Sequence, residues 1–312
     1  MEKVDELAKL IAELSDRDGG YATAIPGLFL SRLTTTTSPR HVLGGALFCV
    51  TAQGAKSVLL SEHRYVYDRN KYLLISADLP LVGQIVDATP QRPMLGISLE
   101  LDFAAIGALM LESELPPLPR VASQQSIFVS ELDADLLDAT IRLVRLLKSP
   151  SQVAVMAPLV KREIFYRLLL GEQSGLLRRM ATDNGQVRRI AAGIEWLRRN
   201  AMRTVPMSEL AREVNMSPST MHSWFKAVTN MSPLQFQKQL RLQEARRLLL
   251  SEVTDAATVS QRVGYDSPSQ FSREYRRLFG APPLQDIQRI RESEDGFHVP
   301  LLHAAQPGLS QS

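Results

Sequence analysis

A stretch of nineteen residues occurs twice in this chain, with the second copy fifty positions after the first. Residues 217–235 read SPSTMHSWFKAVTNMSPLQ, and residues 267–285 read SPSQFSREYRRLFGAPPLQ. Six aligned positions are identical, and most of the others keep their apolar, aromatic or basic character. The duplication constrains the fold strongly, because both copies are expected to form the same small unit of supersecondary structure.

Each copy has the pattern of a helix-turn-helix motif. A short amphipathic segment, 207–214 or 256–263, precedes a turn that contains Asn215 or Gly264. Asparagine and glycine are the residue types that best tolerate the left-handed backbone of such a turn. A second helix is then expected to begin, because a serine at the N-cap followed by proline is a favourable helix start. These serine and proline pairs are Ser217-Pro218 and Ser267-Pro268.

The second helix of each copy is expected to bury one face and to expose the other. The exposed face carries hydroxyl, amide, imidazole and guanidinium groups, which contact base edges and phosphates in DNA complexes. The residues expected to face inward are Met221, Phe225, Val228, Phe271, Tyr275 and Leu278. The residues expected to face outward are Ser219, Thr220, His222, Ser223, Lys226, Ser269, Gln270, Ser272, Arg273 and Arg276.

The distance between the two copies suits a single DNA duplex. Residues 232–252 have an unbroken helical pattern, and about 18–20 residues of helix span roughly 27–30 Å. Successive major-groove segments on one face of B-DNA lie about 34 Å apart. We therefore predict that a stiff central helix presents two recognition helices to adjacent major-groove segments. The alternative is a duplicated helical scaffold that binds no nucleic acid.

Charge is distributed unevenly along the 312 residues, whose net charge is +3. Residues 186–291 contain 17 Lys and Arg against 9 Asp and Glu and carry +8, whereas residues 1–185 carry −2. A basic module joined to a near-neutral one is typical of a polyanion-binding unit under the control of a second domain. A net charge of this size is also compatible with an ordinary solvated surface.

The N-terminal part is predicted to form a β-rich domain. Short segments rich in β-branched and aromatic residues recur about every ten residues between residues 26 and 102, as in a sandwich or small barrel. Helical spacing follows and returns at 133–182, where Pro150 and Pro158 interrupt it. These helices need a partner surface, either the β-domain or another subunit. The predicted domains are a helical segment 1–25, a β-domain 26–113, a linker and helical segment 114–182, a tandem helix-turn-helix domain 186–291 and a disordered tail 292–312.

Several classes of function lack support in the sequence. Cys49 is the only cysteine, which excludes an intramolecular disulfide and a cysteine-rich metal site. No H-x-H pair, nucleophile motif or phosphate-binding glycine loop occurs, so we expect no catalytic activity, no metal and no cofactor. No apolar run is long enough to span a bilayer, and no secretory signal pattern begins the chain, which favours the cytoplasm.

The residues VGYDSPSQFSREYRRLFGAPPLQ at 263–285 closely resemble the C-terminal signature of AraC/XylS-type transcription regulators. Ser260 and Pro282 depart from the family pattern, which usually has alanine at the first position and serine or threonine at the second. The segments VTAQGAKSVLL, YLLISADLPLVGQIVD and PLVKREIFYRLLLGEQSGLLRRMA resemble, less strongly, the β-rich sensor domain of one AraC-type subgroup. The resemblance implies an α+β fold of two domains. These are a cupin-like N-terminal barrel with a helical appendage often used for dimerisation, and an all-α tandem helix-turn-helix domain.

The resemblance also implies roles for the exposed residues of both second helices. Arg273 is the strongest candidate for direct readout, because arginine contacts guanine bidentately with about 1–3 kcal/mol of discrimination. Its alternatives are a phosphate contact and an intradomain salt bridge, for example to Asp266. The alternative for His222 is a side chain that simply points into solvent. The family's base-reading positions fall on Ser219, His222, Ser223, Ser269, Ser272 and Arg273, and Lys226, Arg276 and Arg277 suit phosphate contacts.

Three features of the N-terminal domain are candidates for binding an effector. His63, Arg64 and Arg69 surround a predicted hairpin and suit an anionic ligand such as a phosphate-bearing nucleotide, or are solvated side chains on an edge strand. Cys49 would sense an electrophile or oxidant only as an exposed thiol of low pKa, and its apolar strand favours a buried structural role. Aromatic side chains on the same strands could line an apolar pocket or fill the barrel.

The sequence therefore predicts a DNA-binding transcription regulator whose N-terminal domain responds to an effector. Its expected partners are double-stranded operator or promoter DNA, a small-molecule effector, RNA polymerase and a second copy of the chain, without a membrane. One alternative is an enzyme with a cupin core fused to a DNA-binding module. Another is a regulator that responds to its own concentration or to a partner protein. The effector, the operator, the direction of regulation and the dimer interface stay open at this point.

Overall fold

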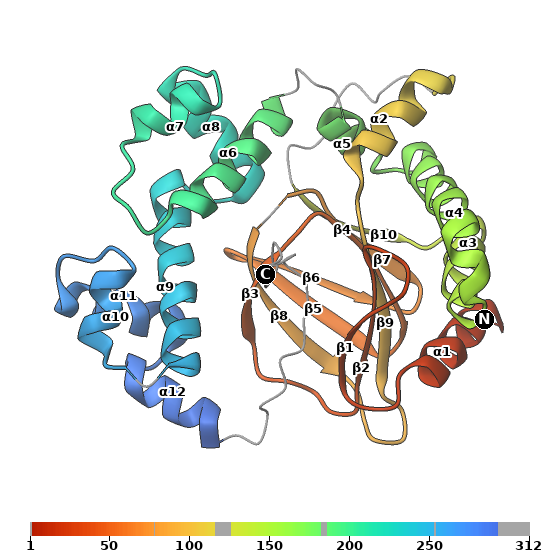
Figure 1. Cartoon of the computed structure of the whole chain (residues 1–312), viewed down its shortest axis with the longest axis horizontal. Coiled ribbons are helices and arrows are strands. Elements are labelled where there is room, and N and C mark those ends of the chain that lie inside the picture. Colours follow the sequence, from red (N-terminus) through yellow and green to blue (C-terminus); the bar gives the residue numbers. More distant parts are fainter. Residues whose placement is uncertain (1, 78, 116–125, 182–185, 253, 293–312) are drawn as a thin grey trace. The chain divides into compact units, whose positions relative to one another are not determined.

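The chain consists of two compact units, with the boundary between Arg188 and Arg189. The N-terminal unit is rich in strands and the C-terminal unit is built from helices (Figure 1), which confirms the predicted α+β class. The boundary lies close to residue 186, where the sequence predicts that the DNA-binding domain begins. The computed structural model describes residues 2–77, 79–115, 126–181, 186–252 and 254–292.

The described strands of the N-terminal unit form a six-stranded and a four-stranded antiparallel sheet (Figure 1). The six-stranded sheet has the order β1-β2-β9-β4-β7-β10, and the four-stranded sheet has the order β3-β8-β5-β6. The strand bounds are β1 (Gly19–Ala22), β2 (Leu28–Leu33), β3 (Arg40–Gly44), β4 (Leu47–Gln53), β5 (Ala55–Leu60), β6 (His63–Asp68), β7 (Lys71–Ile75), β8 (Leu79–Asp87), β9 (Met94–Glu100) and β10 (Ile127–Glu131).

Side chains from the two sheets meet in the interior of this unit. Lys56 of the four-stranded sheet donates a hydrogen bond to Ser31 of the six-stranded sheet. Strand β4 is buried on both faces, because alternate side chains point into this interior and toward a layer of helices outside. The strand pairings stay within each sheet, so the described strands form an open, cupin-like barrel rather than a closed one.

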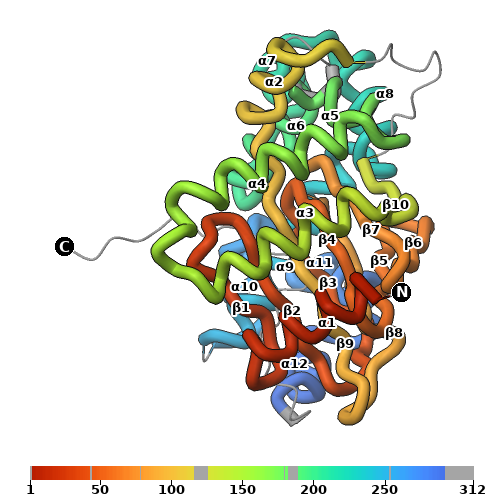
Figure 2. The backbone as a smooth tube through the Cα atoms, turned by 90° about the vertical axis from the view of Figure 1, so that its right-hand side faces the viewer, coloured from red at the N-terminus to blue at the C-terminus, as the bar shows by residue number. Residues whose placement is uncertain are grey.

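A layer of helices covers the outer face of the six-stranded sheet (Figure 2). Helix α1 (Glu2–Leu14) packs on β2, β9 and β4, and its buried Leu7 and Ile11 lie on one face. Helix α3 (Ala134–Arg145) packs against α1, and α4 (Pro150–Leu170) packs against α3. Helices α1 and α4 therefore provide the partner surface that the sequence requires for α3, and α1 connects this layer to the β-domain.

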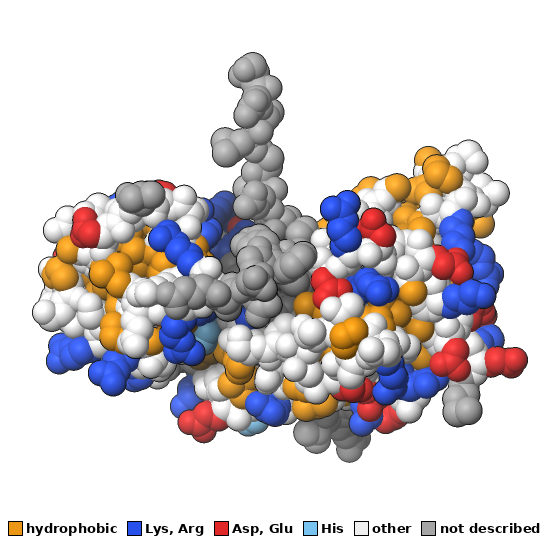
Figure 3. All heavy atoms as spheres, turned by 90° about the horizontal axis from the view of Figure 1, so that it is seen from below, with side chains coloured by type: hydrophobic (Ala, Val, Ile, Leu, Met, Phe, Trp, Pro, Cys, Tyr) orange, Lys and Arg blue, Asp and Glu red, His pale blue; other side chains and the backbone are white. Residues whose placement is uncertain are grey.

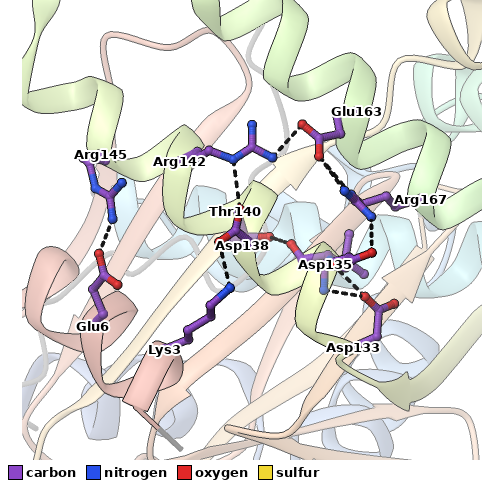
Figure 4. A network of polar contacts seen from close by, with 11 residues as sticks. Lys3, Glu6, Asp133, Asp135, Asp138, Thr140, Arg142, Arg145, Glu163 and Arg167 are labelled. Carbon is purple, nitrogen blue, oxygen red and sulfur yellow. Dashed lines mark hydrogen bonds and ion pairs between the residues drawn. The ribbon is translucent and has the colours of Figure 1, made fainter.

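Ion pairs connect the three helices of this layer (Figure 4). Lys3 of α1 donates to Asp138 of α3 at 2.9 Å. Arg142 contacts Asp138 on its own helix, α3, and also contacts Glu163 of α4. Arg167 also donates to Glu163, at 2.8 Å. A single exposed pair of this kind contributes little, but a network with shared partners fixes the relative positions of the helices more firmly.

Helix α4 runs without interruption through Pro158, so the break that the sequence predicts at this residue is wrong. Proline removes one backbone donor and leaves the carbonyl of Ala154, four residues earlier, without its helical partner. Both residues are exposed, so water can hydrogen-bond that carbonyl. Pro150 lies at the first helical position, where no backbone donor is needed, and separates α4 from the preceding 3-10 turn Leu146–Lys148.

Two strands lie outside the range 26–113 expected for the β-domain. Strand β1 belongs to the segment predicted as helical before residue 26, and β10 lies beyond the proline-rich linker and pairs with β7. Both are edge strands, whose pairing depends on a distant partner and is weakly marked in the local sequence. The other helices of this unit are α2 (Phe103–Glu112) and α5 (Ser174–Ala181). The tail predicted to be disordered lies almost wholly outside the described residues.

The C-terminal unit contains two helix-turn-helix motifs joined by one central helix (Figure 1). The first motif packs through contacts such as that of Phe225 with Phe236, whose ring centroids lie 5.4 Å apart. The second has its own core around Phe271 and Tyr275. The helix bounds are α6 (Gln186–Asn200), α7 (Met207–Glu213), α8 (Pro218–Thr229), α9 (Pro233–Ser251), α10 (Ala256–Arg262), α11 (Pro268–Phe279) and α12 (Pro283–Glu292).

Candidate nucleic-acid interface

The turn of each helix-turn-helix motif has the left-handed backbone expected from the sequence. The φ angle is 51° at Asn215 and 83° at Gly264. A side chain at Gly264 is also excluded by space, because a Cβ atom there would lie 2.3 Å from the Met202 carbonyl oxygen. The turn therefore needs glycine both for its backbone angle and for its close approach to another segment.

The predicted starts of both recognition helices, α8 and α11, are confirmed. Ser217 is the N-cap of α8, and its hydroxyl accepts a hydrogen bond from the backbone N–H of Thr220. Ser267 is the N-cap of α11 and accepts from the backbone N–H of Gln270 in the same way. A proline follows each serine at the first helical position. The capping chemistry of the duplicated segment thus sets where both helices begin.

The faces of α8 and α11 also agree with the sequence pattern, which places the predicted contact residues on the outer side. Met221, Phe225, Val228, Phe271 and Tyr275 are buried, and Leu278 is partly buried. Ser219, His222, Ser223, Lys226, Ser269, Arg273, Arg276 and Arg277 are exposed, and Ser272 is half-buried.

Arg273 has an uncommitted guanidinium group. The side chain is exposed, and within the described ranges no hydrogen bond or ion pair joins it to Asp266 or to another residue. The intradomain salt bridge considered from the sequence is therefore not formed. The side chains of Lys226, Arg276 and Arg277 likewise have no such partner within the described ranges. Figure 3 shows Lys and Arg side chains along the rim of this helical unit, where they can meet a polyanion.

The one acidic residue of α11, Glu274, is held away from this exposed basic face. Lys238 of α9 donates to its carboxylate at 2.7 Å, the Tyr265 hydroxyl donates at 2.8 Å, and Gln270 donates at 3.1 Å. Burial alone would raise the pKa of Glu274, but these three donors outweigh burial and hold the pKa below its usual value. The negative charge is thus neutralised inside the domain and does not repel phosphates at the surface.

The central helix α9 sets the separation of the two motifs. Its 19 residues span about 28 Å. Arg241 in the middle of α9 donates to the Ala201 carbonyl at 2.7 Å, to the Arg203 carbonyl at 2.9 Å and to the Gly264 carbonyl at 2.6 Å. This one side chain therefore joins the loop before α7 to the turn of the second motif. Sequence reasoning missed Arg241, because its partners are backbone oxygens that carry no signal in the sequence.

A second buried connection holds α11 and α12 to α9. Arg246 donates to both carboxylate oxygens of Asp286, at 2.8 and 2.9 Å, and the Tyr275 hydroxyl donates to the same carboxylate at 2.9 Å. Burial, followed by the charge of Asp286, raises the pKa of Tyr275, which keeps the hydroxyl a donor. Sequence reasoning also missed this triad, whose members lie on three different helices.

The basic residues predicted to bind an effector do not form one cluster. His63 and Arg64 are exposed at the start of β6, an edge strand of the four-stranded sheet. Arg69 donates instead to Asp5 of α1 at 2.8 Å. Binding of an effector at these residues stays a prediction.

Cys49 lies in the interior between the two sheets. It is buried in β4, with its Sγ atom 3.5 Å from the Ser98 hydroxyl. Burial raises the pKa of the thiol, which opposes formation of the thiolate that a redox sensor needs. The position therefore favours the structural role considered from the sequence, and a sensing role for Cys49 also stays a prediction.

The described residues show neither a metal site nor a membrane-spanning helix. No group of three or more His, Cys, Asp and Glu residues there could hold a metal ion. No described helix is long and apolar enough to cross a membrane. The expectation that the chain has no catalytic activity stays a prediction.

Comparison with known proteins connects these features to one family. A family model described as the N-terminus of AraC-type transcriptional regulators matches residues 24–176, and a helix-turn-helix domain model matches residues 210–289. The chain is 33% identical over 101 residues to the MmsAB operon regulatory protein of Pseudomonas aeruginosa, a match that covers 32% of this chain and 33% of that protein. It is 28% identical over 138 residues to the transcriptional activator RhaS of Escherichia coli, covering 44% and 47% respectively.

The fold also resembles that of a solved structure. The apo form of a ToxT variant from Vibrio cholerae superposes with a TM-score of 0.53 at 8% identity, covering 86% of this chain and 99% of that one. The chain spans less than half the length of the two curated relatives, whereas the two family models together extend over both of its units. These findings confirm the resemblance in the duplicated segment, and the chain belongs to the AraC-type family of transcriptional regulators.

Proposed function

We propose that this regulator binds one face of a DNA duplex, with α8 and α11 in successive segments of the major groove. One observation carries the proposal: two equivalent helix faces, both exposed, present polar and basic side chains without described ion pairs. Lysine and arginine supply salt-dependent affinity, and hydroxyl, imidazole and guanidinium groups supply sequence choice. The length of α9 is close to the repeat of the groove.

Selection of genomic DNA fragments with the purified full-length protein tests this proposal. At a stated moderate salt concentration, we expect a motif of two blocks whose centres lie about 10–10.5 base pairs apart. The selection is run with and without a small-molecule extract of cells, so that a requirement for an effector does not hide binding. A motif with one block, or no enrichment under either condition, would contradict the double recognition.

The dimer expected from the sequence is proposed to form through α4. Val155, Met156 and Leu159 are large apolar residues on this helix, and they are 68%, 40% and 56% exposed. A groove of about 700 Å³ next to them lies between α4, α2 and the loop after β1, with Ile25 and Phe165 among its mostly apolar lining residues. Apolar surface of this kind is stabilised when a second protein covers it, and a second copy of the chain is the occupant we propose.

Control by an effector, contact with RNA polymerase and a cytoplasmic location complete the proposal. A protein that binds promoter DNA meets RNA polymerase there, and one buried thiol without a disulfide suits a reducing compartment. DNA binding is compared in crude extract and after full purification. A loss of binding that the small-molecule fraction restores supports an effector, whereas identical binding in both preparations supports control by concentration or by a partner protein.

A further inference from the structure

The interior of the N-terminal unit contains a buried lysine. Lys56 of β5 is 3% exposed, and its Nζ atom donates a hydrogen bond to the Ser31 hydroxyl of β2 at 3.1 Å. Within the described ranges no carboxylate pairs with it. A fully buried lysine without a counter-charge is rare, because an ammonium group loses a large hydration energy when it leaves water. Packing alone therefore gives no reason for a lysine at this position.

The strand registers place an unsatisfied hydroxyl opposite Gly96, the residue that lies beside the Lys56 amine. Ser31, Gly96 and Thr51 form one row across β2, β9 and β4, because Gly96 is paired with both of the others. Thr51 is completely buried, and its Oγ1 atom has no hydrogen-bond partner. A Cβ atom on Gly96 would lie 3.4 Å from the Ser31 Oγ atom and 3.7 Å from the Lys56 Nζ atom. The Lys56 amine and the hydroxyls of Ser31 and Thr51 thus lie around Gly96, whose carbonyl oxygen accepts a hydrogen bond from the Ser31 hydroxyl at 3.3 Å.

The titratable groups around Lys56 bring no negative charge to this cluster. Burial raises the pKa of Cys49 in β4 and that of Tyr67 in β6, so both are neutral near pH 7. Burial also lowers the pKa of the Lys56 amine. The free protein therefore has no group in this cluster, within the described ranges, that offsets an ammonium charge.

We propose that Lys56, Ser31 and Thr51 bind the carboxylate of a small acidic effector between the two sheets. A carboxylate has one negative charge and two oxygens that each accept hydrogen bonds, which matches the Lys56 ammonium and the unpartnered Thr51 hydroxyl. The Ser31 hydroxyl, which donates to the Gly96 carbonyl oxygen at 3.3 Å, would rotate to become a further donor to the carboxylate. A phosphate ester carries more charge and would need further cations, and Lys56 is the cation that the described residues bring to this cluster. The inference rests on the proposed control by an effector and names the chemical class of that effector.

Binding of a carboxylate next to Lys56 is expected to change the number of protons bound to the protein. A bound carboxylate favours the ammonium form, so binding raises the pKa of Lys56 from its lowered value in the free protein. Affinity is then constant below the free-state pKa and falls as pH rises between the free and bound values. Within that interval each binding event takes up a proton from solution. Calorimetry in two buffers of different ionisation enthalpy measures this uptake.

The test uses full-length protein and three carboxylate probes, sodium acetate, hexanoate and benzoate, each compared with its uncharged amide. We expect at least one carboxylate to bind in calorimetry and to raise the unfolding temperature, while its amide does not. Lys56→Met is expected to weaken that binding about 30-fold or more. Thr51→Val is expected to weaken it about five- to tenfold. Lys9→Met removes an exposed lysine of α1 and serves as the control that leaves binding unchanged.

Two results would overturn the inference. One is that no carboxylate stabilises the wild-type protein more than its amide does, and the other is equal binding by wild type and by Lys56→Met. If Lys56→Met does not fold, as judged by circular dichroism, Thr51→Val provides the same comparison. A gel-shift assay of the same preparations separates the proposals. DNA binding without carboxylate binding removes only this inference, whereas absence of DNA binding removes the proposed function.

Discussion

At the scale of single residues, the two recognition helices share a position but differ in chemistry. The exposed face of α8 offers His222 and Lys226 beside hydroxyl groups, whereas α11 offers three arginines. Arginine presents a planar set of donors that matches a guanine edge or a phosphate, which lysine and serine do not. We therefore expect α11 to contribute more of the affinity and of the guanine preference than α8.

Replacement of Arg273 tests this difference. Arg273→Ala is expected to weaken specific binding by about 1–3 kcal/mol and to relax the base preference at one operator position, because a bidentate contact is lost. Fluorescence anisotropy with the selected operator and with single-base variants measures both effects. Arg92→Ala, which changes an exposed arginine of the β-domain, is the control. Unchanged affinity and preference would show that α11 does not enter the groove as proposed.

The Arg246–Asp286 pair predicts a large effect on stability. Asp286→Ala leaves a largely buried guanidinium and the Tyr275 hydroxyl without their acceptor, and should lower the free energy of unfolding by about 3–5 kcal/mol. Glu209→Ala removes an exposed ion pair with Arg203 and should have little effect on the free energy of unfolding. Urea denaturation compares the two variants. Equal losses of unfolding free energy in the two variants would mean that the Arg246–Asp286–Tyr275 contacts stabilise the domain no more than an exposed ion pair does.

At the scale of elements, each motif relies on short local signals for its backbone and on long-range contacts for its position. The serine N-caps and left-handed turns belong to the duplicated segment itself, so both motifs form in the same way. Their separation depends on α9, whose Arg241 contacts three carbonyl oxygens from two different loops. The start of a helix and the conformation of its turn can thus be predicted from the local sequence, whereas the position of the motif in the domain cannot.

Two glycines of the second motif provide a matched test of the turn. Gly264 and Gly280 have nearly the same φ, 83° and 82°, but only Gly264 lacks space for a Cβ atom. Gly280→Ala should cost about 1–2 kcal/mol from the backbone angle alone. Gly264→Ala should cost more, about 3 kcal/mol or above, because the Met202 carbonyl must also move. Similar unfolding free energies for the two variants would contradict this reason for glycine in the turn.

The exposed side of α4 predicts an effect on assembly. Leu159→Asp places a charge in the proposed dimer surface and should convert the full-length protein to a monomer at micromolar concentration. Gln152→Asp changes an exposed polar residue of the same helix and should leave the assembly state unchanged. Sedimentation velocity measures both. A wild-type protein that is monomeric at all concentrations tested would refute the dimer.

At the scale of the whole molecule, the charge of the sequence is concentrated in the unit that contains the two motifs. Residues 186–291 carry +8, and the rest of the chain is slightly acidic. The acidic residues of that unit are in several cases engaged in internal pairs, as Glu274 and Asp286 are. Each of these pairs also neutralises one basic residue, so the net charge of the unit is carried by basic residues that have no such partner in the described part of the chain, among them Arg273, Arg276 and Arg277.

Salt dependence tests this concentration of charge. The logarithm of the association constant of full-length protein and operator should fall linearly with the logarithm of salt concentration, because bound phosphates release counterions. Lys226→Ala and Arg276→Ala should each reduce the magnitude of the slope by about 1. Lys9→Ala, on the N-terminal unit, should leave it unchanged. A weak salt dependence in the wild-type protein would contradict the bipartite DNA contact.

The sequence by itself determined the helix-turn-helix pair. Capping serines, the glycine and asparagine of the turns and the apolar stripes act over a few residues, so their effect is visible in the chain. The two-domain class was implied by the resemblance to AraC/XylS-type regulators, and strand spacing gave way to helical spacing after residue 102. Residues such as Ser217 and Phe271 were therefore placed correctly without a structure.

Tertiary structure decided the features that depend on distant partners. It placed Lys56 in the core next to Thr51, joined β10 to a sheet, carried α4 through Pro158 and brought Asp286 to Arg246. In each case the same local sequence suits two environments, and the choice rests on burial and hydrogen bonding across many intervening residues. For this reason the exposed faces of α8 and α11, which we propose to meet DNA, could be predicted from the sequence, whereas the buried polar cluster of the N-terminal unit could not.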